Sequence, residues 1–401
     1  MKNIDFRQLG GNFLFVGLIF VIMVDPTNTI LRLKEVFFIL LLGYNIAFFK
    51  PDLKLLWPIT FIYCAIFCSY ICCVITGEVI VHEELFAVFK AFAPLLLLPW
   101  VKHYNVMNLS IIPAVLVGCF MAILYIFVSS SEVIELAVWT FVKQHNDFIM
   151  MTHRSFLGIP FFGMYYKSIV ALTFTLFILY YQISHKFSIL RIVAILLLTF
   201  AFLVSGTRAT MLLPFAIIGL VVFFRIKDLP RVKYFLYPAL CMVGILFLGV
   251  VVMLATEKSE ASNVIKFAHL TSYANLFDEN PWYFIFGQGP CTRFYSAGFG
   301  AAVTQTEWTY IELVRNYGVF SLLILVVMFY PIYAVLKFPK TDFNIGILGS
   351  YVFYLFIAGT NPLFVSSTGM AVLLMIYSYI ERLKQVQLQH SHPLSINENH
   401  D

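Results

Sequence analysis

Residues 189–225 read ILRIVAILLLTFAFLVSGTRATMLLPFAIIGLVVFFR, which is two apolar runs on either side of a short polar turn at 205–208. Each run is about as long as an α-helix needs to be to cross the hydrocarbon core of a bilayer when its flanks snorkel. The charged residues of the stretch are Arg191, Arg208 and Arg225, at its two ends and in the turn. The stretch therefore predicts two antiparallel membrane helices.

Runs of this kind recur along the whole chain. The composition agrees with them, because 61% of the residues are hydrophobic and 12% are charged, against about 25% charged in soluble domains. This excludes a soluble enzyme, a disordered chain and a small disulfide scaffold. We expect an all-α, polytopic integral membrane protein that forms a single membrane domain over residues 1–401. Twelve helices are expected, near residues 10–27, 35–49, 55–75, 85–100, 109–128, 167–184, 189–206, 209–225, 234–255, 319–336, 345–360 and 367–381.

The distribution of lysine and arginine gives the orientation, because these residues favour the cytoplasmic side of short loops. If the N-terminus is cytoplasmic, fifteen of the 26 basic residues lie inside and ten lie in the longer outer loops, with Lys90 left within a helix. We therefore expect both termini to be cytoplasmic. The fifteen are Lys2, Arg7, Lys50, Lys54, Lys102, Lys186, Arg191, Arg225, Lys227, Arg231, Lys233, Lys337, Lys340, Arg382 and Lys384.

This topology places two long hydrophilic segments on the outer face, near residues 129–166 and 256–318. Loops of that length are usually functional. The first contains the amphipathic stretch Glu132–Lys143 and the second contains Asn263–Phe277, and we expect both stretches to be interfacial helices. The polar tail, residues 382–401, is expected in the cytoplasm.

Four basic residues at the outer face are candidates for a site, since ionisable groups in a membrane are costly without partners. Lys90 lies in a helix, where it either serves a site or snorkels to the surface. His153 and Arg154 suit phosphate binding or proton movement, and equally an anchor to lipid headgroups. Arg208 follows a glycine turn at the start of a helix, which suits an oxygen-rich anion, although a topological anchor explains it too.

A further candidate region closes the second outer loop, where a helical pattern begins at Thr304. On such a helix Glu307 and Arg315 fall within about 80° of each other, so a carboxylate and a guanidinium face the same cavity. The alternative is structural, with Thr304 and Glu307 forming a capping box and Glu312 and Arg315 forming an i, i+3 ion pair. The sequence contains no HExxH, CxxC, P-loop or GxSxG motif, so metal and nucleotide chemistry have no support.

Three stretches, together with a long outer loop, resemble a known family. They are Ser205-Gly206-Thr207-Arg208-Ala209 after a long apolar helix, Gly287-x-Gly289 near the end of the large outer loop, and Glu307-Trp308-x-Tyr310-x-x-Leu313-x-x-x-Tyr317-Gly318 before another helix. In these features the chain resembles the O-antigen ligase and O-antigen polymerase superfamily. His153-Arg154-Ser155-Phe156 also resembles an outer-loop motif of many members. The resemblance covers most of the chain as topology, with its motifs confined to these short stretches.

The resemblance implies a glycosyltransferase of the bacterial inner membrane that acts at the periplasmic face on glycans linked to undecaprenyl diphosphate. Carried across by position, Arg208 and Arg293 would hold the diphosphate, Lys90 would assist, and Arg315 would add charge nearby. Tyr310 suits stacking on a sugar ring and equally an interfacial aromatic belt. The residues placed at the substrate are thus Arg208, Arg293, Arg315, Lys90, His153, Arg154 and Tyr310.

Ligases of the superfamily have a histidine at the start of the helix after the large loop, where this chain has Thr304 to Glu307. The departure favours a polymerase, in which Glu307 faces the acceptor hydroxyl and orients it or accepts its proton. Arg208 would stabilise the charge that develops on the leaving diphosphate. The reaction requires no metal and no cofactor.

Three functions remain open from the sequence. The first is a polymerase of O-antigen or a related surface polysaccharide, and the second is an O-antigen ligase that transfers glycan to lipid A-core. The third, a transporter or flippase, predicts internal repeats and midplane charges, and the sequence shows neither. The expected partners are undecaprenyl-diphosphate-linked oligosaccharide and membrane lipid, with a chain-length regulator and a flippase implied by the resemblance. A net charge of +5 does not argue for nucleic acid.

Overall fold

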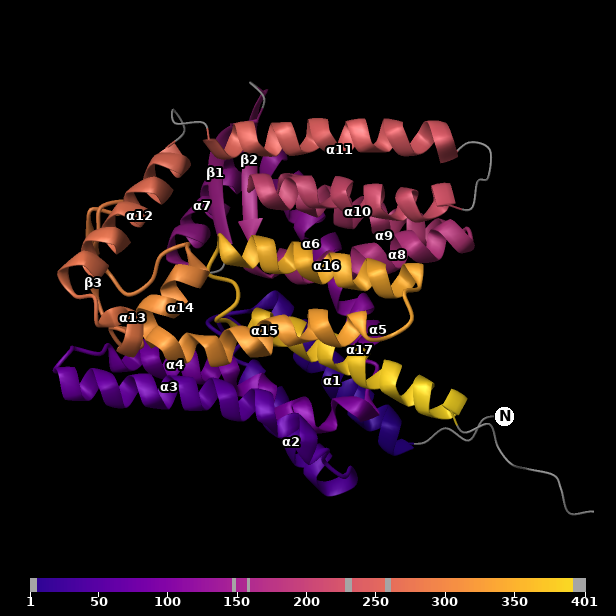
Figure 1. Cartoon of the computed structure of the whole chain (residues 1–401). Coiled ribbons are helices and arrows are strands. Elements are labelled where there is room, and N and C mark those ends of the chain that lie inside the picture. Colours follow the sequence, from indigo (N-terminus) through magenta and orange to yellow (C-terminus); the bar gives the residue numbers. More distant parts are fainter. Residues whose placement is uncertain (1–5, 146–148, 157–158, 228–232, 257–260, 392–401) are drawn as a thin grey trace, which may run out of the picture.

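The computed structural model describes residues 6–145, 149–156, 159–227, 233–256 and 261–391. Figure 1 shows a bundle whose long helices run side by side. The α-helices of the first half are α1 (Phe6–Val24), α2 (Lys34–Phe48), α3 (Trp57–Thr76), α4 (His82–Phe92), α5 (Val106–Leu109), α6 (Ile111–Ser130), α7 (Glu132–Gln144), α8 (Thr173–His185) and α9 (Ile189–Val204). In the second half they are α10 (Arg208–Lys227), α11 (Lys233–Thr256), α12 (Ala261–Glu279), α13 (Tyr283–Phe286), α14 (Thr309–Tyr317), α15 (Ser321–Leu336), α16 (Asp342–Gly359) and α17 (Ser367–Ser391).

Short 3₁₀ segments lengthen four of these helices. They are η1 (Leu53–Leu56) before α3, η2 (Ala93–His103) after α4, η3 (Lys167–Leu172) before α8 and η4 (Gly318–Phe320) before α15. The segment η2 contains Pro99, which lacks an N–H group and so cannot continue an α-helical hydrogen-bond ladder. These 3₁₀ segments therefore lengthen the helices where the chain is not regular α-helix.

The helices confirm the expected class, an all-α membrane protein. The chain is helical at each of the twelve expected apolar runs. Within the described residues, eight helical segments are long and apolar enough to cross a membrane. They are Phe6–Val24, Leu53–Thr76, His82–His103, Val106–Ser130, Lys167–His185, Ala209–Ile226, Thr309–Leu336 and Asp342–Gly359.

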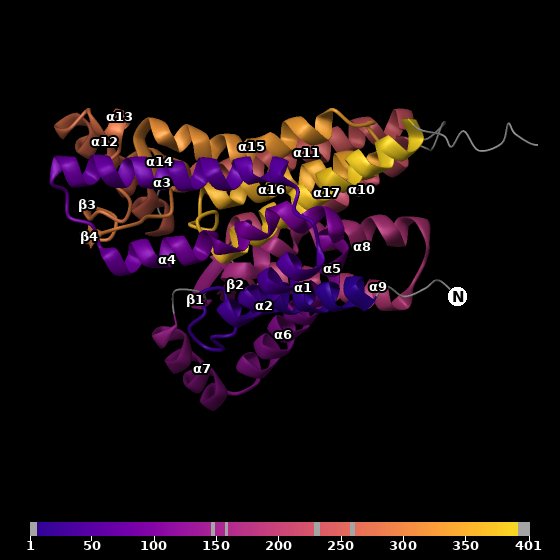
Figure 2. The same ribbon diagram turned by 90° about the horizontal axis from the view of Figure 1, so that it is seen from below.

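The two ends of the bundle differ. The beginning of α1 and the end of α17 lie at the same end, whereas α12, α13 and the small strands beside them lie at the opposite end (Figure 1). The view from below in Figure 2 shows the same division, with α7 near the second end.

The polar segment after α6 contains a β-hairpin that the sequence pattern did not predict. Strands β1 (Ile149–Phe156) and β2 (Ile159–Tyr166) are antiparallel, and Ile149 pairs with Tyr166 at the base. The hairpin crosses the ends of several bundle helices (Figure 1). The helix expected at Glu132–Lys143 is present as α7, so the first outer loop is a helix followed by a hairpin.

The second polar segment folds on a small core of its own. The expected helix at Asn263–Phe277 is present as α12, and strands β3 (Phe294–Ser296) and β4 (Ala301–Val303) pair antiparallel. Tyr273 and Phe277 of α12 pack with Tyr283 and Phe294, and the Tyr273 and Phe294 rings stack with centroids 5.2 Å apart. These contacts hold α12 against the rest of the loop.

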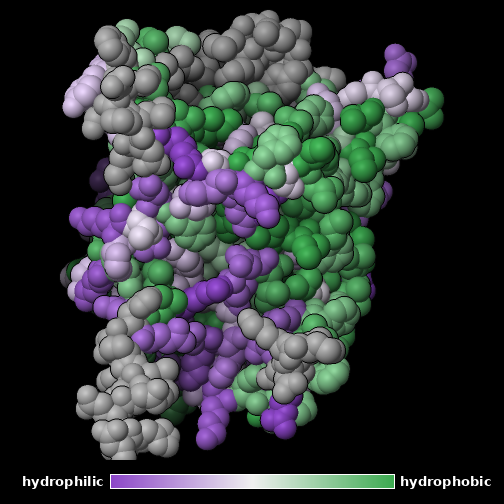
Figure 3. Space-filling view, turned by 90° about the vertical axis from the view of Figure 1, so that its right-hand side faces the viewer, coloured by the Kyte–Doolittle hydropathy of each residue, from purple (hydrophilic) through white to green (hydrophobic). Residues whose placement is uncertain are grey.

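The helices of the bundle share one continuous apolar core, and some of their outward faces are also apolar. Phe15, Phe177 and Tyr354 are among its fully buried side chains. Leu116 and Phe120 of α6 are exposed, as lipid-facing side chains of a membrane helix are. Figure 3 shows the end of the bundle that holds the beginning of α1 and the end of α17, with hydrophilic residues over part of it and hydrophobic residues along one flank.

Candidate functional site

Glu307 lies at the end of the bundle that holds α12 and α13, in an ion pair that joins distant parts of the chain. It precedes α14, and its Oε2 is 3.1 Å from Nζ of Lys266 on α12. Lys266 also approaches the backbone oxygen of Thr360, between α16 and α17, at 3.4 Å. The Glu307 side chain is 36% exposed, so its carboxylate is accessible as well as positioned.

The helix expected from Thr304 begins only at Thr309, with Trp308 at its N-cap. The alternative interpretation, a capping box of Thr304 and Glu307, is therefore wrong. Thr304 instead donates its hydroxyl to Glu84 of α4, and Glu307 pairs with Lys266. Because Glu307 precedes the helix, it does not share a helical face with Arg315. Contacts to other elements override the local capping pattern.

Arg315 occupies the centre of a buried hydrogen-bond network inside the second outer loop. Its side chain has no exposed area, and its Nη2 lies 2.8 Å from Oε2 of Glu312. This i, i+3 ion pair is the one that the sequence predicted as an alternative. The guanidinium also lies over the ring of Phe294, 4.5 Å from its centroid. Its other acceptors are Gln288 Oε1 at 2.7 Å, Thr292 O at 3.2 Å and Thr304 O at 2.6 Å.

Glu312 is held just as fully. Its Oε1 accepts hydrogen bonds from Tyr273 Oη at 2.6 Å and from the Thr306 backbone N–H at 2.8 Å. Burial, with Glu312 beside the phenol, raises the pKa of Tyr273, so Tyr273 remains a donor at neutral pH. The Arg315 and Glu312 pair thus ties α12, the loop and α14 together, which is a framework role.

His269 is a buried residue of this region that the sequence reasoning missed. Its Nδ1 is 2.7 Å from Oγ of Ser296, and its Nε2 is buried with no hydrogen-bond partner among the described residues. Burial lowers the pKa of His269; the nearby Glu307 and Glu312 oppose that shift, while Lys266 adds to it. Residues 266, 269 and 273 are spaced by three and four along α12, which is a signal that the sequence did contain.

The β-hairpin brings Arg208 and Glu307 into one neighbourhood. Gly206, in the turn before α10, has φ +71° and packs against Gly163 of β2, where a Cβ on Gly206 would lie 2.9 Å from the Gly163 Cα. Two residues along the same strand, Tyr165 has a buried hydroxyl without a hydrogen-bond partner in the described part of the chain. Burial raises the pKa of Tyr165, and the nearby Glu307 carboxylate raises it further. The hairpin therefore links the start of α10 to Glu307.

Some expected site residues lie outside the described side chains. The backbone of Arg208 opens α10, and His153 and Arg154 occupy β1 opposite Phe162 and Phe161, but the structure does not describe their three side chains. Their expected roles stay predictions.

Arg293, Lys90 and Tyr310 occupy three different surroundings. Arg293 is exposed just before β3. Lys90 is 48% exposed on α4, with Nζ 4.0 Å from Glu35 and 4.8 Å from the centroid of the Phe86 ring. Tyr310 donates its hydroxyl to the Leu355 oxygen of α16 at 2.8 Å, so it packs within the bundle. Arg293 and Lys90 are thus accessible to a ligand, and Tyr310 is committed to a helix contact.

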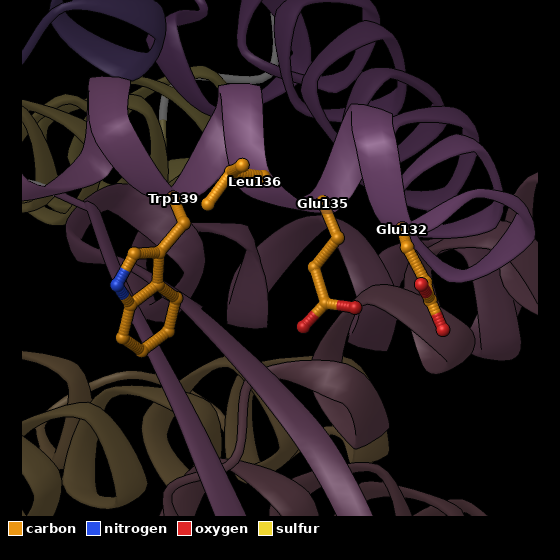
Figure 4. Close-up of a pocket in the computed structure, with 4 residues that line it drawn as sticks. All are labelled: Glu132, Glu135, Leu136 and Trp139. Atoms are coloured by element: carbon orange, nitrogen blue, oxygen red, sulfur yellow. The ribbon is translucent and has the colours of Figure 1, made fainter.

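An open cavity of about 270 Å³ lies along α7. Its lining comes from one face of that helix, as Figure 4 shows for Glu132, Glu135, Leu136 and Trp139. Two carboxylates and an indole suit contact with sugar hydroxyls and a sugar ring, whereas the carboxylates would repel a diphosphate. The cavity is therefore no place for the charged part of a lipid diphosphate.

Within the described residues, no group of three or more His, Cys, Asp or Glu side chains is arranged to hold a metal ion. Comparison of the chain with protein-family models, with curated proteins and with solved structures finds no match.

Proposed function

We propose that this protein is a membrane glycosyltransferase that polymerises O-antigen or a related surface polysaccharide. The observation that carries the proposal is the position of Glu307. An accessible carboxylate, fixed by Lys266, lies where both outer segments meet and where the hairpin reaches the start of α10. The family resemblance of the motifs around Arg208 and Glu307 supplies the chemistry that this position would serve.

In the proposed reaction the acceptor is a sugar hydroxyl of one lipid-linked repeat unit. Its oxygen attacks the anomeric carbon of the donor glycan, the bond from that carbon to the diphosphate oxygen breaks, and Glu307 accepts the hydroxyl proton. Undecaprenyl diphosphate leaves with the bonding electron pair. Cationic side chains and the amide groups at a helix N-terminus stabilise its charge.

The proposal includes a location and a topology. The protein is placed in the bacterial inner membrane with twelve crossings, both termini in the cytoplasm and the two polar segments in the periplasm. The excess of basic residues on one side and the position of both terminal helices at one end of the bundle support this orientation. A chain-length regulator and a flippase would be its partners.

The test is the lipopolysaccharide ladder of the host after deletion of the gene and restoration from a plasmid. We expect the deletion to leave core plus one repeat, wild type to restore the ladder, and Glu307→Gln to fail. Loss of a general base lowers the rate by about 10²–10⁴-fold. Glu279→Gln, at the exposed end of α12, is the matched control and should restore the full ladder.

Immunoblots of membrane fractions would verify equal amounts of each variant. A full ladder with Glu307→Gln would contradict the proposed role of the carboxylate. Complete loss of O-antigen in the deletion strain, with accumulation of long lipid-linked glycan, would identify a ligase instead.

A further inference from the structure

Lys34, at the beginning of α2, is a buried cation in an unusual setting. Its residue surface is 7% exposed, and its Nζ donates a hydrogen bond to Oγ of Ser367 at 3.0 Å. No carboxylate of the described residues forms a salt bridge with it. A buried ammonium is costly unless an opposite charge compensates it, so this position favours a negatively charged ligand.

The two carboxylates nearest to Lys34 already have other partners. Asp25 accepts hydrogen bonds from the backbone N–H groups of residues 29, 30 and 31, at 3.0, 2.9 and 2.6 Å. Glu35 accepts one from the Asn28 amide and lies 4.0 Å from Lys90. Both acids thus stabilise the loop between α1 and α2 and the neighbouring α4, instead of pairing closely with Lys34.

Two further lysines act on Lys34 from other elements. Lys90 of α4 and Lys167 of η3 both repel its ammonium, while Glu35 and Asp25 attract it. The charges of Lys34, Lys90 and Lys167, on α2, α4 and η3, therefore act on one another. A group of lysines held together in this way is favoured when an anion with several oxygens lies among them.

The first turn of α17 adds donors to the same place. α17 runs from Ser367 to Ser391, so the positive end of its helix dipole lies at Ser367, where the N–H group of Gly369 is capped by Oγ of Ser366 at 3.1 Å. The hydroxyl of Thr368, in that turn, is buried and has no hydrogen-bond partner among the described residues. A phosphate oxygen would satisfy such groups and also Lys34.

Two segments connect this place to Glu307. The first segment is residues 165–167. The charge of Glu307 acts on the Tyr165 hydroxyl, and the charge of Lys167 acts on Lys34. Between them, Tyr166 donates a hydrogen bond to the backbone oxygen of Val24, which precedes Asp25. Residues 165 and 167 are about 7 Å apart along an extended strand.

The second segment connects α16 to α17. Thr360 accepts a hydrogen bond from Lys266, the partner of Glu307, and Asn361 accepts one from Thr309 at 2.7 Å. The same segment continues to Ser367, which holds Lys34. Two segments of the chain thus connect the carboxylate to the lysines.

We propose that Lys34, Lys90 and Lys167, with the first turn of α17, bind the diphosphate of a polyprenyl-diphosphate-linked substrate. This inference rests on the proposed function, because it assigns the leaving group of that reaction to a place beside Glu307. Lys34 and Lys167 were not among the residues expected from the sequence.

The test is direct binding of farnesyl diphosphate to the purified full-length protein in detergent, by titration calorimetry. We expect wild type to bind farnesyl diphosphate, and Lys34→Met and Lys90→Met each to weaken that binding by about tenfold or more. Lys90 is half-exposed, so Lys90→Met keeps the test valid even where Lys34→Met disturbs folding. Lys340→Met, an exposed lysine beyond α15, is the matched control and should bind as wild type.

The same titration with inorganic diphosphate, and with phosphatidylglycerol in mixed micelles, separates the sources of the phosphate. Binding of farnesyl diphosphate that is tighter than either of these supports a polyprenyl ligand. Equal binding of phosphatidylglycerol, or unchanged binding by both lysine variants, overturns the proposal. Because the assay needs no turnover, the binding result stays separate from the ladder test, in which a full ladder in the deletion strain would refute polymerisation and a full ladder with Glu307→Gln would contradict the role of the carboxylate.

Discussion

His269 gives the protein a pH dependence that arises from one side chain. Burial lowers its pKa in the folded protein, whereas the unfolded chain keeps the ordinary value of about 6.5. Between the two values the unfolded chain binds more protons, so stability rises with pH and is lost as the pH falls below about 6.5. We expect unfolding in detergent about 2 °C or more lower at pH 5.5 than at pH 7.5, measured by scanning fluorimetry.

The control for this prediction is His269→Gln, which keeps a polar side chain at the position and removes the titration. The dependence on pH between 5.5 and 7.5 should be smaller in this variant. An identical dependence in both proteins would show that other groups cause it.

At the level of single residues, the sequence identified chemistry better than contacts. The Glu312 and Arg315 ion pair, which the spacing predicted as the structural alternative, is present. Lys266 was not predicted as a site residue, because its partner Glu307 lies far away in sequence and no local pattern connects the two. Lys34 was missed for the same reason, since Ser367 is nearly the whole chain away.

Among the elements, α14 depends on one buried ion pair. Arg315→Met should destabilise the second outer loop by about 3–5 kcal/mol, because Glu312 would stay buried without its cation. Faster cleavage between residues 261 and 317 in limited proteolysis would show this. Arg293→Met, which removes an exposed arginine from the same loop, should leave the cleavage rate unchanged. Equal resistance of the Arg315→Met protein would contradict the framework role.

The helical elements were predictable because long apolar runs in a membrane protein have few alternatives to helix. The hairpin of β1 and β2 was not predictable, since the residues of its strands do not alternate between polar and apolar. Packing supplies what the pattern lacks: Gly206 and Gly163 lie too close together for a side chain on the first of them. The start of α14 was misplaced because contacts to α4 and α12 override a local capping pattern.

The orientation of the whole molecule can be measured by labelling cysteines in cells. All seven native cysteines would first be replaced by serine or alanine. A membrane-impermeant maleimide, applied after permeabilisation of the outer membrane, should label Glu279→Cys at the end of α12. Lys340→Cys, in the loop between α15 and α16, should react only after lysis. The reverse pattern would place α12 and Glu307 on the cytoplasmic side.

For the molecule as a whole, composition and hydropathy were enough to give the class, since 61% hydrophobic residues leave no soluble alternative. Composition and hydropathy did not predict how the helices are arranged. Apolar faces that touch lipid and apolar faces that touch other helices look alike in sequence, so α1 packing against α17 leaves no local trace.

The hairpin base also determines when the protein becomes complete during its synthesis. Tyr165 emerges from the ribosome long before Glu307, and Lys34 long before Ser367. At about 5–20 residues per second, each waits on the order of ten seconds to one minute for its partner. A chain that stalls before its last helix therefore lacks the contact between Lys34 and Ser367, and under the proposed function it could not consume lipid-linked sugar.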